Sequence, residues 1–155
     1  MSERPEQGEV DAAAFFRESM TEHEFMSAII AHAVARGWGE PIDRRMTKKE
    51  KAEKLRPYHV TISKKGAAGF PDLVMVRNGR QVIAELKREK GGRTSVAQRK
   101  WLDELYAVQL AIIAELCGVA GCAVLCNRHT EIARRLFGVY EWKPSSWPEI
   151  EAVLA

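Results

Sequence analysis

The hydrophobic positions along the chain recur with two periods, one typical of helices and one typical of strands. Apolar side chains return every three or four residues over residues 21–35 and 96–116, which predicts two amphipathic helices. Residues 40–56 are charged and indicate a short exposed basic helix or a mobile arm, and further helices are expected over residues 130–137 and after Ser146. Three helix starts carry a capping box, in which two side chains bond the first free backbone groups of the helix. These boxes pair Thr21 with Glu24, Thr47 with Glu50, and Ser95 with Gln98.

Strands are predicted where apolar residues alternate or form short runs. Residues 58–63 alternate, and residues 121–126 form a short apolar run that is typical of a buried strand. Two further β-rich runs, residues 73–77 and 80–86, flank Asn78-Gly79, the dipeptide best suited to a two-residue type I′ hairpin. The element order predicts a single-domain α/β fold with a mixed central sheet flanked by helices.

The expected hairpin brings two carboxylates together. With Asn78-Gly79 as the turn, Asp72 lies directly opposite Glu85, and Lys87 lies on the same face as Glu85. Opposed like charges are destabilising, and a divalent cation between the two carboxylates would offset their repulsion. Oxygen-rich sites of this kind suit Mg²⁺ or Mn²⁺. The alternative interpretation is a surface hairpin with a cross-strand ion pair.

Composition and charge favour a globular protein that binds a polyanion. Hydrophobic residues make up 46% of the 155 residues and charged residues 29%, which argues against disorder and fibres. Residues 44–100 hold 17 basic and 5 acidic side chains, a net charge of +12, within a chain of net charge +3. Such segregation is typical of a nucleic-acid-binding surface, although solvated helix faces would also explain it.

Basic residues on both sides of the carboxylate pair are the candidates for phosphate contacts. Near the pair these are Lys64, Lys65, Arg88, Lys90 and Arg93, and in the segment from Arg44 to Arg56 they are Arg44, Arg45, Lys48 and Lys49.

The domain organisation expected from the sequence has three parts. Residues 1–20 form a leader, residues 21–140 form one domain with a basic insert at about 43–56, and residues 141–155 form a tail with a short helix. No signal-peptide pattern or 18-residue apolar run is present, so we expect a cytoplasmic protein, in a phage or a bacterium, without a membrane partner or small-molecule cofactor.

Two polar residues on the expected helices are candidates for supporting roles. Glu22 continues the apolar stripe formed by Phe25, Ile29 and Ala33, where a carboxylate is unusual unless it meets a cation. Gln98 is either part of its capping box or part of the site.

The three cysteines are too few and too closely spaced for a disulfide framework. Cys122 and Cys126 fall on the expected buried strand and no CxxC pair is present, so we interpret them as buried thiols rather than zinc ligands with His129.

Four motifs in this order resemble the PD-(D/E)xK nuclease superfamily, and more closely its VRR-NUC (virus-type replication-repair nuclease) branch. The resemblance covers roughly residues 21–127. The motifs are Thr21-Glu22, Gly69-Phe70-Pro71-Asp72, Glu85-Leu86-Lys87 and Gln98.

The resemblance implies a restriction-endonuclease-like core and metal-dependent hydrolysis of DNA phosphodiester bonds. It assigns Asp72, Glu85 and the Leu86 carbonyl to Mg²⁺ or Mn²⁺, and Lys87 to the attacking water. Glu22 and Gln98 would support them. The basic insert and the tryptophans Trp142 and Trp147 have no clear counterpart in the family.

The function expected from these observations is endonuclease cleavage of branched DNA, with Holliday junctions as the substrate class. The helix over residues 101–116 is apolar on more than one face, which favours a homodimer with two symmetric sites. The alternatives are a flap nuclease or exonuclease in replication, recombination or repair, a catalytically idle DNA-binding module, and a small protein-interaction domain.

Overall fold

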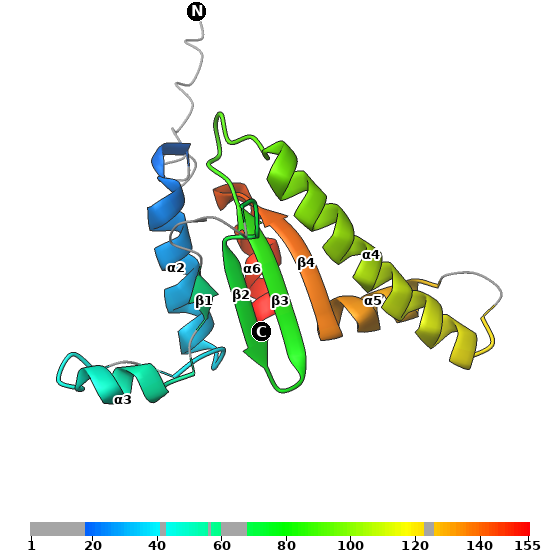
Figure 1. Ribbon diagram of the computed structural model, residues 1–155, viewed down its shortest axis with the longest axis horizontal. Coiled ribbons are helices and arrows are strands. Elements are labelled where there is room, and N and C mark those ends of the chain that lie inside the picture. The colour runs from blue at the N-terminus through cyan, green and yellow to red at the C-terminus, as the bar shows by residue number, and fades with distance from the viewer. Residues whose placement is uncertain (1–17, 41–42, 56, 60–67, 123–125) are drawn as a thin grey trace, which may run out of the picture.

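The fold is an α/β arrangement of four strands and five α-helices over the described part of the chain (Figure 1). The computed structural model describes residues 18–40, 43–55, 57–59, 68–122 and 126–155. The helices are α2 (Glu22–Ala35), α3 (Lys48–Glu53), α4 (Val96–Val119), α5 (Asn127–Leu136) and α6 (Trp147–Leu154), with a short 3₁₀ turn η1 (Pro144–Ser146) before α6. The strands are β1 (Tyr58–His59), β2 (Leu73–Arg77), β3 (Arg80–Leu86) and β4 (Phe137–Trp142).

The strands form one mixed sheet in the order β1-β2-β3-β4. β1 and β2 are antiparallel, as are β2 and β3, whereas β4 runs parallel to β3. The predicted hairpin is confirmed: Arg77 pairs with Arg80, and Asn78 and Gly79 both have positive φ angles, as a type I′ turn requires. The mixed sheet and its flanking helices confirm the predicted α/β class.

Different helices pack on the two sides of the sheet. On one face, α2 and α6 pack against alternate residues of β2, β3 and β4 to form the main core. Its buried members are Phe25, Ile29, Ala33, Trp38, Leu73, Met75, Val82, Ala84, Leu86, Trp142, Ile150 and Leu154. Residues 141–155 therefore pack on the same core as the rest of the chain. On the β4 side of the sheet, α4 and α5 contact β4 and α5 also contacts β3, whereas Val76 on β2 stays exposed.

All three predicted capping boxes are present, at Thr21, Thr47 and Ser95. Each pairs a side-chain oxygen with the amide three residues on, and a returning side chain with the cap amide, so both free donors are satisfied. The helix starts predicted from these motifs are confirmed.

One predicted element, the strand over residues 121–126, was wrong, and the structure gives new bounds for two others. Gly121 lies in a turn and Cys126 is the N-cap of α5, so neither residue belongs to the strand predicted over residues 121–126. Residues 123–125 lie outside the part of the chain that the structure describes. The helix expected at 130–137 is α5, which begins at Asn127 and ends one residue earlier, and β4 follows it directly. Of the strand expected at 58–63, the structure describes Tyr58–His59.

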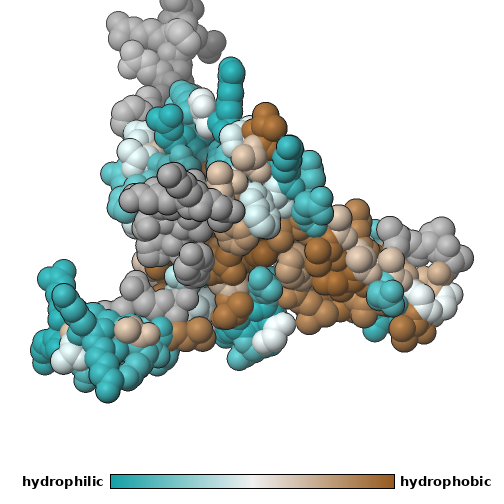
Figure 2. Space-filling model, viewed as in Figure 1, coloured by the Kyte–Doolittle hydropathy of each residue, from teal (hydrophilic) through white to brown (hydrophobic). Residues whose placement is uncertain are grey.

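The surface differs sharply between the ends of the molecule. Figure 2 shows a hydrophilic surface over α3 and a hydrophobic one over the sheet and α4. Exposed apolar side chains on α4 include Val96, Val108 and Leu110, so this helix is apolar on more than one face, as the sequence indicates. No helix among the described residues has the length and hydrophobicity that a membrane crossing requires.

Candidate functional site

The ends of β2 and β3 bring Asp72, Glu85 and Lys87 together. Asp72 immediately precedes β2, and its Oδ2 accepts a hydrogen bond of 2.9 Å from the backbone N–H of Leu86. Leu86 points into the main core, so the strand alternation turns Glu85 and Lys87 to the opposite face, toward α4. The predicted sharing of one face by Glu85 and Lys87 is confirmed by the contact between them.

Glu85 is the centre of this cluster. Its side chain is 0% exposed, and Lys87 is 4% exposed as a residue. Glu85 Oε1 accepts hydrogen bonds from Lys87 Nζ and from Gln98 Nε2. Its second oxygen, Oε2, is buried and has no hydrogen-bond partner in the part of the chain that the structure describes. A buried, unpaired carboxylate oxygen is costly, and it is the kind of atom that a cation would satisfy.

The surroundings of Glu85 raise the pKa of its carboxyl to about 7. Burial is the main cause, because it disfavours the charged form. The hydrogen bond from Lys87 lowers the pKa, while the negative charge of the nearby Asp72 raises it. The two carboxyl groups therefore interact, as the hairpin register predicts.

This raised pKa predicts how stability depends on pH. Between pH 4.5, the ordinary pKa of the group, and pH 7, the folded chain holds a proton on Glu85 that the unfolded chain has released. The free energy of unfolding should therefore fall as pH rises through this window, by up to about 3 kcal/mol, and level off above it. Urea unfolding from pH 4.5 to pH 8, compared with Glu85→Gln, isolates this contribution. Parallel curves for the two proteins would contradict it.

Gln98 serves both of the roles that its position allows. Its Oε1 accepts a bond of 2.8 Å from the Ser95 N–H and completes the capping box, while its Nε2 donates to Glu85. The start of α4 is thus fixed to the carboxylate at the end of β3.

Gly69 is what allows the loop before Asp72 to approach α4 so closely. Its φ of +84° lies in the left-handed region, and a Cβ at this position would lie 2.6 Å from the Gln98 backbone nitrogen. Gly91 has a similar φ of +75° but has open space around its Cβ position.

Replacing Gly69 by Ala should therefore cost more than the same change at Gly91. We expect Gly91→Ala to lower the free energy of unfolding by about 1 kcal/mol, through backbone strain alone. Gly69→Ala adds overpacking against the backbone of α4 and should cost about 3 kcal/mol. Chemical denaturation of both variants measures the difference, and equal losses would show that the loop moves away freely.

Glu141 belongs to the same cluster and was missed by sequence reasoning. It pairs with Glu85 across the parallel strands β3 and β4, so both side chains lie on the α4 face. Thr94 Oγ1 donates to Glu141 Oε2 at 2.6 Å, and Arg99 lies 3.6 Å from the same oxygen. The sequence signal for this strand is the alternation over Phe137–Trp142. It follows the helical pattern of α5 without a break, because β4 begins directly after the helix.

Glu22 is not brought into the cluster. It is the first residue of α2 and is exposed, like its neighbours in residues 21–24. The structure records no hydrogen bond or ion pair between Glu22 and another described residue. The stripe of Phe25, Ile29 and Ala33 is buried as predicted, but burial begins only at Phe25, and the supporting role of Glu22 stays a prediction.

The candidate phosphate-binding residues separate into two groups. Arg88, Lys90 and Arg93 are exposed in the loop that follows β3, directly after Lys87. Lys90 pairs there with Glu18. Lys64 and Lys65 lie outside the described residues.

The second group lies at the far end of the strands from the carboxylates. Its exposed members are Arg44, Arg45, Lys48 and Lys49, and Arg45 pairs with Asp43. Leu55, two residues after α3, lines a hollow with the hairpin turn at Asn78-Gly79, and Figure 1 shows α3 at this end. These residues therefore do not flank the carboxylate cluster.

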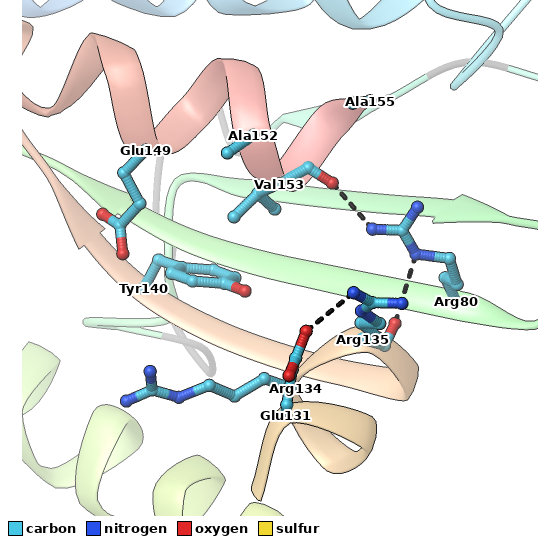
Figure 3. Close-up of a pocket in the computed structure, with 9 residues that line it drawn as sticks. All are labelled: Arg80, Glu131, Arg134, Arg135, Tyr140, Glu149, Ala152, Val153 and Ala155. Carbon is cyan, nitrogen blue, oxygen red and sulfur yellow. Dashed lines mark hydrogen bonds and ion pairs between the residues drawn. The ribbon is translucent and has the colours of Figure 1, made fainter. Parts of the chain in front are cut away.

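A separate cavity of about 650 Å³ lies between α5 and α6 (Figure 3). Arg80 reaches across it and donates to the Val153 carbonyl at 2.7 Å, and Glu131 and Arg135 form an ion pair at its edge. None of the residues that line it belongs to the carboxylate cluster.

The interpretation of the cysteines as separate buried thiols was also wrong. The structure places Cys117, Cys122 and Cys126 around the Nδ1 atom of His129. Cys122 and Cys126 are only partly buried and lie at a turn and a helix cap rather than on a strand.

Comparison of the chain with family models, with curated proteins and with solved structures finds no match.

Proposed function

We propose that the chain is a metal-dependent nuclease that hydrolyses phosphodiester bonds in branched DNA, with four-way junctions as the substrate class. The observation that carries this proposal is the buried Glu85 carboxylate beside Asp72, with Lys87 and Gln98 bonded to one oxygen and the other left unpaired. The VRR-NUC resemblance of the four motifs supports the same assignment.

The residues present fit Mg²⁺ or Mn²⁺. Glu85 Oε2 lacks a partner among the described residues, Asp72 interacts with the same carboxyl group, and oxygen donors suit both cations. Asp72, Glu85 and the Leu86 carbonyl would hold the ion. When bound, it would stabilise the negative charge that develops on the phosphate during hydrolysis.

The other side chains prepare the site for this reaction. Lys87 holds a buried ammonium beside Glu85, where it can orient the attacking water and attract the phosphate. Gln98 fixes the orientation of the Glu85 carboxylate from the start of α4. Hydrolysis breaks one P–O bond and leaves a phosphate monoester and a hydroxyl group.

Charge and apolar surface support a DNA substrate and a dimer. Arg88, Lys90 and Arg93 extend from the site as exposed cations suited to backbone phosphates. The exposed apolar face of α4 offers a surface for a second copy, which would place two sites symmetrically for a four-way junction.

A cleavage assay tests the proposal. Labelled four-way junction, 5′-flap, 3′-flap and blunt duplex are incubated with the protein and Mg²⁺, Mn²⁺ or EDTA, while light scattering gives the mass of the species. Symmetric nicks in the junction, dependent on metal, are the expected result. Cuts confined to flaps or ends would retain the nuclease and change its substrate. Salt-sensitive binding without cleavage under any metal would overturn the proposal in favour of a DNA-binding module.

A further inference from the structure

Four metal-ligating side chains converge at the junction of α4 and α5, away from the carboxylate cluster. Cys117 lies in the last turn of α4, Cys122 follows the helix, Cys126 caps α5, and His129 lies in the first turn of α5. The distance from His129 Nδ1 to the sulfur atom is 3.3 Å for Cys117, 3.5 Å for Cys122 and 3.1 Å for Cys126. All four ligand atoms lie within 4.8 Å of one another.

Hydrogen bonding does not account for this arrangement. A neutral imidazole nitrogen carries either one proton or one lone pair, so His129 Nδ1 can form one good hydrogen bond with one thiol. The other two sulfur atoms would then lie near the same nitrogen without a bond to it, although the backbone N–H groups of Arg128 and His129 donate to Cys126. A single ion at the centre of the four atoms would satisfy them all.

The spacing matches a tetrahedral zinc site. Zinc binds thiolate sulfur at about 2.3 Å and imidazole nitrogen at about 2.0 Å, which places ligand sulfur and nitrogen about 3.5 Å apart across a tetrahedron. The three observed distances lie close to this value. Sulfur-rich tetrahedral sets favour zinc over the hard cations that carboxylates prefer.

We infer that Cys117, Cys122, Cys126 and His129 form a structural Zn²⁺ site that joins the end of α4 to the start of α5. All four ligands come from the protein, so no position remains open for substrate, as is usual in structural zinc sites. This site and the proposed nuclease site use different residues and different metals, so each can fail without the other.

The local packing explains why a metal is useful here. Ile113, Cys117 and Ala133 form a small buried cluster that is separate from the main core. Such a cluster buries little apolar area, and bound zinc contributes folding energy directly. The zinc site would fix the angle between α4 and α5, and α4 carries Gln98 at its other end.

Metal analysis of the full-length chain tests this inference. The protein is purified without chelators and reconstituted with equimolar Zn²⁺, and zinc is measured by mass spectrometry of the metal. One zinc per chain is expected. Replacement by Co²⁺ should give the visible bands of a tetrahedral, sulfur-ligated ion, and removal of zinc should lower the midpoint of thermal unfolding.

Variants separate a ligand from a packing residue. His129→Ala should weaken zinc binding by at least about 100-fold, whereas His129→Cys, which restores a fourth ligand, should retain one zinc per chain. His23→Ala, at an exposed histidine on α2, and Glu85→Gln should leave the zinc content unchanged. A folded wild-type chain with no zinc after reconstitution would overturn the inference. A disulfide between two of the cysteines, or an iron–sulfur absorption spectrum, would overturn it as well.

Discussion

Replacing Glu85 by Gln is expected to lower the rate of metal-dependent DNA cleavage by about 10³-fold or more, because it removes the charge that would bind the cation. Asp72→Asn should have an effect of similar size, since the two carboxylates act on the same ion. DNA binding should be retained or become tighter, because each change removes negative charge near the phosphates. Single-turnover cleavage of a labelled junction and a salt titration of binding measure the two effects separately.

Glu131→Gln is a matched control for this prediction. Glu131 is an exposed carboxylate at the edge of the cavity between α5 and α6, where it pairs with Arg135. Its replacement should leave cleavage unchanged. If Glu131→Gln abolished cleavage while Glu85→Gln retained it, the chemistry would belong to that cavity and the assignment to the strand ends would be wrong.

Replacing Lys87 by Met is expected to be the most destabilising single change in the site. It leaves the fully buried Glu85 without the cation that contacts it, and removal of one partner of a buried ion pair costs about 3 kcal/mol or more. The loss should be largest at pH 8. Near pH 5.5 the carboxyl of Glu85 is protonated in the folded chain, because its pKa is about 7, and the loss should be much smaller. Urea unfolding at the two pH values measures both quantities.

Two further variants distinguish the loss of charge from the loss of packing in Lys87→Met. The double variant Glu85→Gln with Lys87→Met should recover most of the stability, since no buried charge then remains. Lys90→Met removes an exposed pair with Glu18 and should cost less than about 1 kcal/mol. A pH-independent loss in Lys87→Met would indicate that packing, rather than charge, is the contribution of this side chain.

The centre of the candidate site could be predicted from the sequence because local rules determine it. A two-residue turn at Asn78-Gly79 fixes the register of β2 and β3, and strand alternation then places Glu85 and Lys87 on one face. Gln98 is located by the capping box of α4. These relations depend on sequence neighbours alone.

The parts that were missed depend on contacts between distant segments. β4 begins at the residue after α5 without a loop, so the helical pattern conceals the change to a strand, and Glu141 was missed with it. The convergence of Cys117 with His129 depends on where α4 ends and how α5 packs against it. Glu22 has the predicted angular position on α2, but the helical period does not reveal that the first turn of this helix is exposed.

The order in which the strands pair during folding depends on how far apart the paired residues are in the sequence. Residue 85 meets residue 72 through a tight turn, but it meets residue 141 only after α4 and α5 have folded back on the sheet. Contacts that are close in sequence lose less chain entropy and form faster. We therefore expect the hairpin to form early and the parallel strand to dock late. Lys87, two residues from Glu85, is then present when the carboxylates first approach, so their repulsion is countered before the rest of the sheet arrives.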